Sequence, residues 1–253
     1  MVRKAGLLGK WLPDKKLNRF KAALALFKSQ ALAAADHRFE PRDEDLYPCL
    51  DDATGSTGFD PHYIYHTAWA ARRIRLQNPA RHVDLSSYLY FSTLLSAFVP
   101  VEFFDYRPAD IRLSGFKSGK ADLNSLPFAD NTVTSLSCMH TVEHVGLGRY
   151  GDEIDPTGDL RAIRELARVL APGGHLYFVV PVGAPRLCFN AHRIYSYEQI
   201  VDAFSDLELL EFSLIPDNAG ENGMIEYADP ALVAEQRYAC GCFIFSKPEK
   251  STC

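Results

Sequence analysis

From residue 62 onward, short apolar runs alternate with longer segments in which apolar side chains recur every three or four positions. The first pattern is typical of buried strands and the second of amphipathic helices. The predicted strands are 82–86, 101–105, 133–139, 175–182, 207–215 and 240–246, and the predicted helices are 63–76, 88–98, 158–170 and about 196–204. Strands that alternate with helices indicate an α/β fold with a doubly wound, mostly parallel sheet.

Two features of this pattern indicate where function lies. The last two predicted strands have no helix between them, so one of the two is expected to run antiparallel. In a doubly wound sheet, ligands bind beyond the carboxyl ends of the strands, where the winding direction reverses. We therefore expect functional residues directly after positions 86, 105, 139 and 182, where polar side chains collect.

The first 60 residues differ from the rest and are predicted to form an extension of an α/β domain over 61–253. Apolar residues at helical spacing predict a helix from Asp14 to about Ala35: Leu17, Phe20, Leu24, Phe27 and Ala31. Residues 1–28 hold eight basic side chains and one acid. A helix packed on its own domain, or on a sister subunit in a homodimer, is the ordinary interpretation. The alternative is a basic amphipathic helix resting on an anionic membrane, with Leu7, Leu8 and Trp11 as anchors.

Composition narrows the class of protein. An apolar fraction of 47% and a charged fraction of 23% are typical of a globular protein, and no run approaches the roughly 20 apolar residues of a membrane span. The net charge of −5 argues against nucleic acid as the main partner. The six cysteines form no C-x-x-C pair, which favours reduced thiols in the cytoplasm over disulfides or a zinc site.

Residues 41–61 are acidic and rich in Gly, Pro, Ser and Thr, and predict an irregular connection.

The stretch ADLNSLPFADNTVTSLSCMHTVEHVG, followed by LRAIRELARVLAPGGHLYFVVP, resembles the second half of class I S-adenosylmethionine-dependent methyltransferases. An acid, a Leu-Pro-Phe turn, an apolar strand, a Glu-His pair and Arg-Val-Leu-x-Pro-Gly-Gly occur in the family's order. The resemblance implies a seven-stranded, Rossmann-like methyltransferase fold and S-adenosylmethionine as cofactor. The pieces HYIYHTAWAARRI, HVDLSSYLYF, FFDYRP and FNAHRIYS are similar to a methyltransferase-like group catalogued as a domain of unknown function.

The resemblance also implies cofactor-binding positions. Asp105 ends a strand and would accept hydrogen bonds from the ribose hydroxyls, while Asp122 and Leu123 would contact the adenine. A strand-end or turn-capping aspartate is the ordinary alternative for both acids. Met139 would lie under the methionine part, and His66 is a further contact candidate. The family's first loop reads D-x-G-x-G-x-G, and Asp84 matches its first, cofactor-binding position. Asp84 is followed here by Leu-Ser-Ser-Tyr-Leu-Tyr, so that Ser86 and Ser87 would have to hold the cofactor's carboxylate.

Methyl transfer needs in-line positioning and, for a hydroxyl acceptor, a base. The candidates are His140, Glu143, His144 and His192; a structural network at the strand end is the alternative for the first three. Tyr63 or Tyr65 could form a lid over the cofactor. The acids between 152 and 159 could hold Mg²⁺ with a sugar diol, but a solvated loop is the ordinary interpretation, and no metal is assigned.

Three functions are compatible with these residues. The predicted one is methyl transfer to a small polar acceptor, such as a hydroxyl of a sugar or glycan intermediate. The missing glycines favour a second, a methyltransferase fold that has lost the cofactor and serves as a binding or scaffold protein. A nucleotide-dependent oxidoreductase is disfavoured, because no G-x-G-x-x-G fingerprint follows the first predicted strand.

Overall fold

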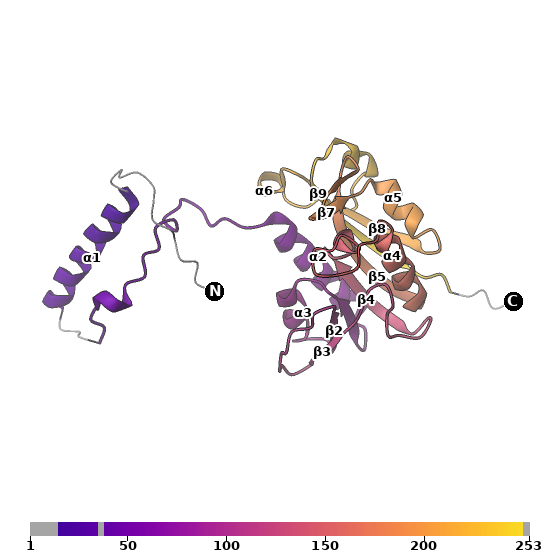
Figure 1. The fold of residues 1–253 in the computed structure, drawn as a ribbon, viewed down its shortest axis with the longest axis horizontal. Coiled ribbons are helices and arrows are strands. Elements are labelled where there is room, and N and C mark those ends of the chain that lie inside the picture. The colour runs from indigo at the N-terminus through magenta and orange to yellow at the C-terminus, as the bar shows by residue number, and fades with distance from the viewer. Residues whose placement is uncertain (1–14, 35–37, 250–253) are drawn as a thin grey trace. The chain divides into compact units, whose positions relative to one another are not determined.

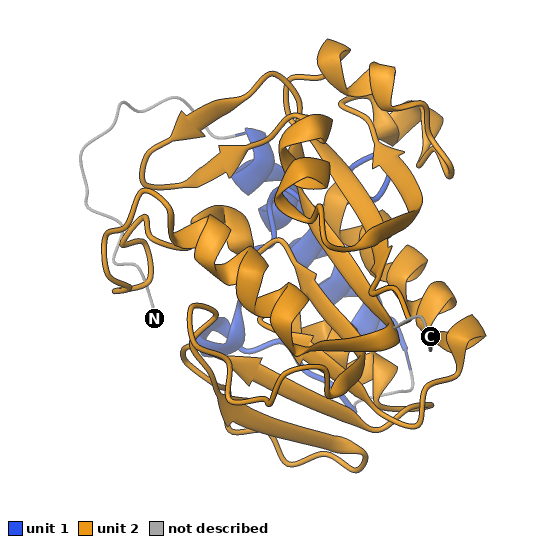
Figure 2. Ribbon diagram, turned by 90° about the vertical axis from the view of Figure 1, so that its right-hand side faces the viewer, with its two compact units in different colours: residues 1–58 blue, residues 59–253 orange. Residues whose placement is uncertain are grey.

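The computed structural model describes residues 15–34 and 38–249 of the chain, which divides into two compact units, residues 1–58 and 59–253 (Figure 2). In the first unit, helix α1 spans Lys15–Ala33 and has no buried residue. Lys28 pairs with Asp43 at 3.2 Å, and Lys16 pairs with Asp51. The anchor residues Leu7, Leu8 and Trp11 lie outside the described residues, and whether α1 meets a membrane or a subunit stays a prediction. Among the described helices, none is long and apolar enough to cross a membrane.

The second unit is built on a seven-stranded sheet in the order β3-β2-β1-β4-β5-β9-β8 (Figure 1). Only β9 runs antiparallel to its neighbours β5 and β8. The doubly wound, mostly parallel sheet and its single antiparallel strand are therefore confirmed. The strands are β1 (His82–Leu85), β2 (Val101–Asp105), β3 (Phe116–Lys120), β4 (Val133–Met139), β5 (Leu170–Val182), β8 (Glu208–Ile215) and β9 (Ala239–Ser246).

Helices cover both faces of the sheet, each over its own apolar cluster. Helices α4 (Gly158–Val169) and α5 (Tyr197–Ala203) pack with one cluster, to which β5 contributes Phe178 and Val180. Helices α2 (Pro61–Gln77), α3 (Leu89–Leu95) and the short α6 (Ala219–Asn222) pack with the other, to which β5 contributes Tyr177 and Val179. The continuous apolar run of β5 follows from this burial on both faces.

The main differences between the structure and the sequence prediction lie in the strands. Strand β3 was not predicted, because Phe116 is the only fully buried residue in this edge strand. Strand β5 begins at Leu170, where the sequence predicts the end of a helix, because Leu170 already pairs with Val133 across a register shift. The hairpin of β6 (Arg186–Cys188) and β7 (His192–Ile194) was also missed; its strands are three residues long, too short for a periodic signal.

A buried polar network fastens β1 to β4 and α3. Asp84 is fully buried and accepts hydrogen bonds from the hydroxyls of Ser92 and Ser137. On the same strand, His82 lies 2.8 Å from both the Ser135 and the Ser137 hydroxyls. Burial raises the pKa of Asp84 to about 6, although the serine hydrogen bonds oppose the shift. The network is local to the sheet centre and fixes the strand from which the first loop departs.

A second buried polar contact holds α2 on the sheet. Arg73 donates to Glu211 of β8 through Nε at 2.8 Å and Nη2 at 2.9 Å, and the Trp69 indole donates to the same carboxylate at 2.8 Å. Burial alone would raise the pKa of Glu211, but the hydrogen bonds from Arg73, Trp69 and Ser213 together lower it. Since α2 begins at Pro61, this anchor also positions the residues of its first turn.

We expect Arg73→Leu to lower the free energy of unfolding by about 3–5 kcal/mol, because it leaves the Glu211 carboxylate buried without its cation. Adding Glu211→Leu should restore part of this loss, since the uncompensated charge is then gone. Urea denaturation of the two single variants and the double variant measures the coupling. Arg72→Leu, at an exposed position on the same helix, is the matched control. Strictly additive losses would show that the pair does not act as a unit.

Asp84→Asn tests the buried carboxyl through pH. The pKa of Asp84 is about 6 in the folded protein and 3.8 in its ordinary state, so the folded form favours the proton. The stability of the native chain relative to Asp84→Asn should therefore fall by about 3 kcal/mol as pH rises from about 4 to about 6, and stay level above. Denaturation curves across this range measure the difference, with exposed Asp206→Asn as control. A difference that does not change with pH would contradict the burial of an ionisable group there.

Candidate functional site

Two adjoining cavities lie at the carboxyl edge of the parallel strands. The smaller, of about 410 Å³, is lined by residues that follow β2, β3 and β4. The larger, of about 1260 Å³, is lined by the start of α2, the loop after β1 and the segments around 191–192, 216–217 and 237–238. Ser86, His140, His144 and Tyr150 line both cavities, so the two form one continuous site. This is the edge at which the sequence predicts ligand binding.

The smaller cavity is lined by four of the predicted cofactor residues, Ser86, Asp105, Asp122 and Leu123. Asp105 ends β2, and its carboxylate accepts from the backbone N–H of Arg107 at 2.7 Å. The Asp122 carboxylate accepts from the backbone N–H of Asn124 at 2.8 Å, as a turn-capping aspartate does. Because an ionised carboxylate offers about four acceptor positions, one backbone bond orients each acid and leaves it able to bind a ligand.

The loop after β1 follows the backbone path of a glycine, although its residue is serine. Ser86 has φ of +57°, a left-handed conformation that glycine adopts readily and serine rarely does. Its N–H donates to Phe104 at 2.8 Å, and its carbonyl accepts from the Thr141 hydroxyl at 3.0 Å. The Ser87 hydroxyl accepts from the Met139 N–H at 3.1 Å. These bonds tie the loop to β2 and to the residues after β4.

Neither tyrosine at the other two glycine positions fills the smaller cavity. Tyr88 is 45% exposed and lines the larger cavity, while Tyr90 is 68% exposed and lines neither. The aromatic side chains therefore leave the space beside Asp105 open.

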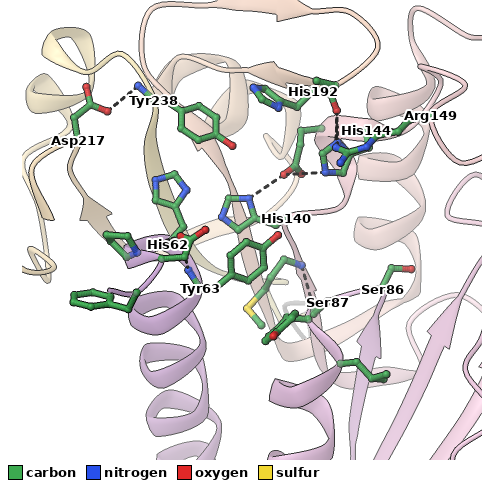
Figure 3. Close-up of a pocket in the computed structure, with 18 of the residues that line it drawn as sticks. His62, Tyr63, Ser86, Ser87, His140, His144, Arg149, His192, Asp217 and Tyr238 are labelled. Carbon is green, nitrogen blue, oxygen red and sulfur yellow. Dashed lines mark hydrogen bonds and ion pairs between the residues drawn. The ribbon is translucent and has the colours of Figure 1, made fainter. Parts of the chain in front are cut away.

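A histidine pair shares one buried carboxylate between the two cavities (Figure 3). Glu143 is 1% exposed, and its Oε1 lies 2.9 Å from Nδ1 of His140 and 3.7 Å from Nε2 of His144. Glu143 Oε2 is also buried and has no hydrogen-bond partner among the described residues. Nδ1 of His144 lies 2.6 Å from the Ala191 carbonyl, which anchors this ring to the β6–β7 hairpin. The structure thus brings together three residues that the sequence places at one strand end.

Aromatic and basic side chains line the larger cavity. The His192 ring packs against Tyr238 with centroids 5.0 Å apart, and burial followed by the neighbouring His144 lowers the pKa of His192. Tyr238 is held through its backbone N–H, which donates to Asp217 at 2.8 Å. A neutral imidazole that faces a cavity can accept a proton from a bound hydroxyl.

Two predicted cofactor residues lie outside both cavities. Asp84 belongs to the buried network under β1. His66 is fully buried, with Nδ1 2.6 Å from the His62 carbonyl, and burial holds its pKa well below the usual value. Of the two lid candidates, Tyr63 lines the larger cavity and Tyr65 lines neither.

Three carboxylates of the acidic loop over residues 152–159 already have partners within the protein. Asp152 accepts from the N–H groups of Gly146 at 2.8 Å and Tyr150 at 3.1 Å. Asp155 pairs with Arg161 at 2.6 Å, and Asp159 accepts from the Tyr195 hydroxyl at 2.9 Å. Asp152 and Glu153 also line the smaller cavity.

Sequence reasoning missed several residues of the larger cavity: His62, Arg149, Tyr150, Asp217 and Tyr238. His62 lies in the first turn of α2, after the helix-capping Asp60. An aspartate followed by proline is a recognisable helix start in the sequence, so this signal could have placed His62. Tyr238 precedes β9, whose antiparallel direction brings its beginning to the same edge as the ends of the parallel strands.

We expect Ser86→Gly to leave the protein as stable or to stabilise it by up to about 1 kcal/mol, because glycine adopts a positive φ without strain. Ser86→Val should destabilise it by about 1–2 kcal/mol, because a β-branched side chain is strained in the left-handed region. Thermal and urea denaturation measure both. Ser205→Val, at an exposed position without a positive φ, should lack this penalty. If Ser86→Gly is less stable than the native chain, the backbone at position 86 does not have the conformation that favours glycine.

Comparison with known proteins adds a family match and structural relatives. Residues 123–214 match the model of DUF268, described as a Caenorhabditis protein of unknown function. No curated protein matches the chain in sequence.

Three solved structures share the fold. The N-methyltransferase NodS of Bradyrhizobium japonicum, crystallised with S-adenosylhomocysteine, is 17% identical, with coverage of 89% of this chain and 99% of that one and a TM-score of 0.52. The 1,6-didemethyltoxoflavin-N1-methyltransferase of Burkholderia thailandensis is 9% identical, with coverage of 98% and 94% and a TM-score of 0.50. The cyclase SpnF is 17% identical, with coverage of 73% and 81% and a TM-score of 0.50.

At these identities the structural relatives establish the fold, and the family match is to a domain without an assigned reaction. Both agree with the resemblance seen in the sequence. The chain shares its fold with these methyltransferases, and its residues 123–214 match the DUF268 model.

Proposed function

We propose that this chain transfers a methyl group from S-adenosylmethionine to a small polar acceptor, such as a hydroxyl of a sugar or glycan intermediate. The observation that supports it is the continuous site of two cavities, with Asp105 and Asp122 in the smaller and His192 in the larger. Such a division suits a nucleoside cofactor on one side and an acceptor on the other. The fold by itself does not decide the reaction, since SpnF, a cyclase, has it too.

The residues of the smaller cavity suit the nucleoside. Asp105 would accept hydrogen bonds from the two ribose hydroxyls, and Asp122 would accept from the adenine amino group beside the Leu123 backbone. Ser86, which lines both cavities, and Met139, which lines the larger, would border the methionine part. The cofactor, when bound, supplies an electrophilic methyl group on a sulfonium.

The residues of the larger cavity suit a polar acceptor. Tyr63 and Tyr238 offer aromatic faces, and Arg149 and Asp217 offer hydrogen-bonding groups of both kinds. His192 is the base we propose for a hydroxyl acceptor, because it lines this cavity and its lowered pKa keeps the imidazole neutral near pH 7. His144, oriented by Glu143 and the Ala191 carbonyl, is the second candidate base. Proton removal by a positioned base typically contributes about 10²–10⁴-fold to a rate.

The alternative function is a binding or scaffold protein that has lost the cofactor. The serine and tyrosines at the glycine positions favour it. The two functions are separated by whether the smaller cavity takes up the nucleoside.

We expect calorimetry to show saturable binding of S-adenosylhomocysteine and S-adenosylmethionine to the full chain. Asp105→Ala should weaken both by about 10–100-fold, because each hydrogen bond to a charged group contributes about 1.5–3 kcal/mol. Asp206→Ala, at an exposed aspartate that lines neither cavity, should bind like the native chain.

His192→Ala gives a complementary result. It should leave S-adenosylhomocysteine binding within about twofold, because the ring lines the larger cavity alone, and lower turnover of a hydroxyl acceptor by about 10²-fold or more. Absence of nucleoside binding to the folded native chain would overturn the enzymatic proposal and favour the scaffold.

A further inference from the structure

Three side chains from distant parts of the sequence converge at the wall of the larger cavity: His62, His140 and Cys240. A nitrogen of each imidazole and the Cys240 sulfur all lie within 4.8 Å of one another. His62 comes from the first turn of α2, His140 directly follows β4, and Cys240 lies near the start of β9. The two imidazole rings are nearly parallel, with centroids 5.4 Å apart (Figure 3).

The spacing of these atoms approaches that of ligands on one zinc ion. On tetrahedral zinc, with bonds of about 2.1 Å to nitrogen and 2.3 Å to sulfur, neighbouring nitrogen and sulfur ligands lie about 3.6 Å apart. Nε2 of His140 and Sγ of Cys240 lie 3.4 Å apart. His62 then has to move inward by about 1 Å to complete the set. Its position in the first turn of a helix, with a half-buried side chain, permits this adjustment.

The neighbours of these residues are also those that a metal site requires. Glu143 Oε1 lies 2.9 Å from Nδ1 of His140, and the other ring nitrogen, Nε2, is turned toward Cys240. A carboxylate that orients a ligating histidine in this way is typical of zinc sites. Glu143 Oε2 is buried without a hydrogen-bond partner among the described residues, and an ionised carboxylate here would offset the charge of a cation.

Zinc is bound by neutral imidazoles and by a thiolate. Its binding here would release the Cys240 thiol proton to solvent as the sulfur–metal bond forms.

We propose that His62, His140 and Cys240 bind one zinc ion, with the fourth coordination position open to the larger cavity. His62 and His140 both line that cavity, while Cys240 lies buried beside them. Three protein ligands with an open fourth position are typical of catalytic rather than structural zinc. The absence of a C-x-x-C motif hides such a site from sequence inspection, because each ligand comes from a different segment.

The consequence for chemistry rests on the proposed function. A zinc ion at this wall would bind an acceptor oxygen in the open position and lower its pKa toward neutrality. His140 would then serve as a ligand, and the base role would remain with His192 or His144. Metal binding itself depends on neither the cofactor nor the acceptor, so the two proposals fail separately.

The test is a titration of the chelator-treated full chain with Co²⁺ and Zn²⁺, without cofactor. We expect one equivalent of Co²⁺ to bind with a near-ultraviolet thiolate-to-cobalt absorption, which Zn²⁺ then removes. Cys240→Ser should abolish this absorption. Cys242→Ser, whose sulfur is buried 4.0 Å from that of Cys240, is the matched control and should retain it.

Two further variants keep the proposal testable if Cys240→Ser does not fold. His62→Ala, at a half-buried position, should weaken Co²⁺ binding by about tenfold or more, and Glu143→Gln should weaken it by about 10–100-fold. Circular dichroism confirms that each variant is folded. The proposed site is overturned if the native chain binds no Co²⁺, or binds it without the thiolate absorption. Co²⁺ binding that is unchanged in His62→Ala would overturn it as well.

Discussion

The direction of the strands is the constraint on which this molecule depends. Because β1, β2, β4 and β5 run parallel, the residues at and just beyond their ends, including Ser86, Asp105 and His140, lie at one edge of the sheet. The antiparallel strand β9 adds a second consequence. It begins where β5 ends, with Cys240 opposite Pro181, and so brings its first residues to that same edge. Residues far apart in the chain therefore share one site.

Helix α2 completes the site from outside the sheet. Trp69 in its middle and Arg73 in its second half bind Glu211 of β8, and its first turn carries His62 and Tyr63 to the larger cavity. The helix rises about 1.5 Å per residue, so the anchor at Arg73 lies about 16 Å from His62. A buried ion pair is costly to break but seldom strongly stabilising by itself. Its value here is positional, because it fixes the helix against one sheet edge while leaving the binding end free of the anchor.

The histidines differ in environment, and their environments suit different tasks. His66 and His82 are fully buried and stay neutral because burial opposes their charge. His140 and His144 share the Glu143 carboxylate, which orients both rings. His192 faces the larger cavity with a lowered pKa. Neutral imidazoles can accept protons or ligate metals, whereas imidazolium ions can do neither, so the burial of this region preserves both kinds of chemistry.

The sequence by itself determined the architecture and the strand ends. Apolar periodicity reports which residues face a core, so β2 and β4 and the strand-end positions of Asp105 and Glu143 could be predicted. The position of Asp122, after the unpredicted strand β3, followed only from the family resemblance. Only the tertiary structure decided what meets across the sheet. The left-handed backbone at Ser86 depends on its bonds to β2 and Thr141, and the meeting of His62, His140 and Cys240 depends on strand register and on the reversal at β9. Local patterns do not predict such contacts, because the residues next to a position in the sequence do not specify which distant residues it will meet in the folded chain.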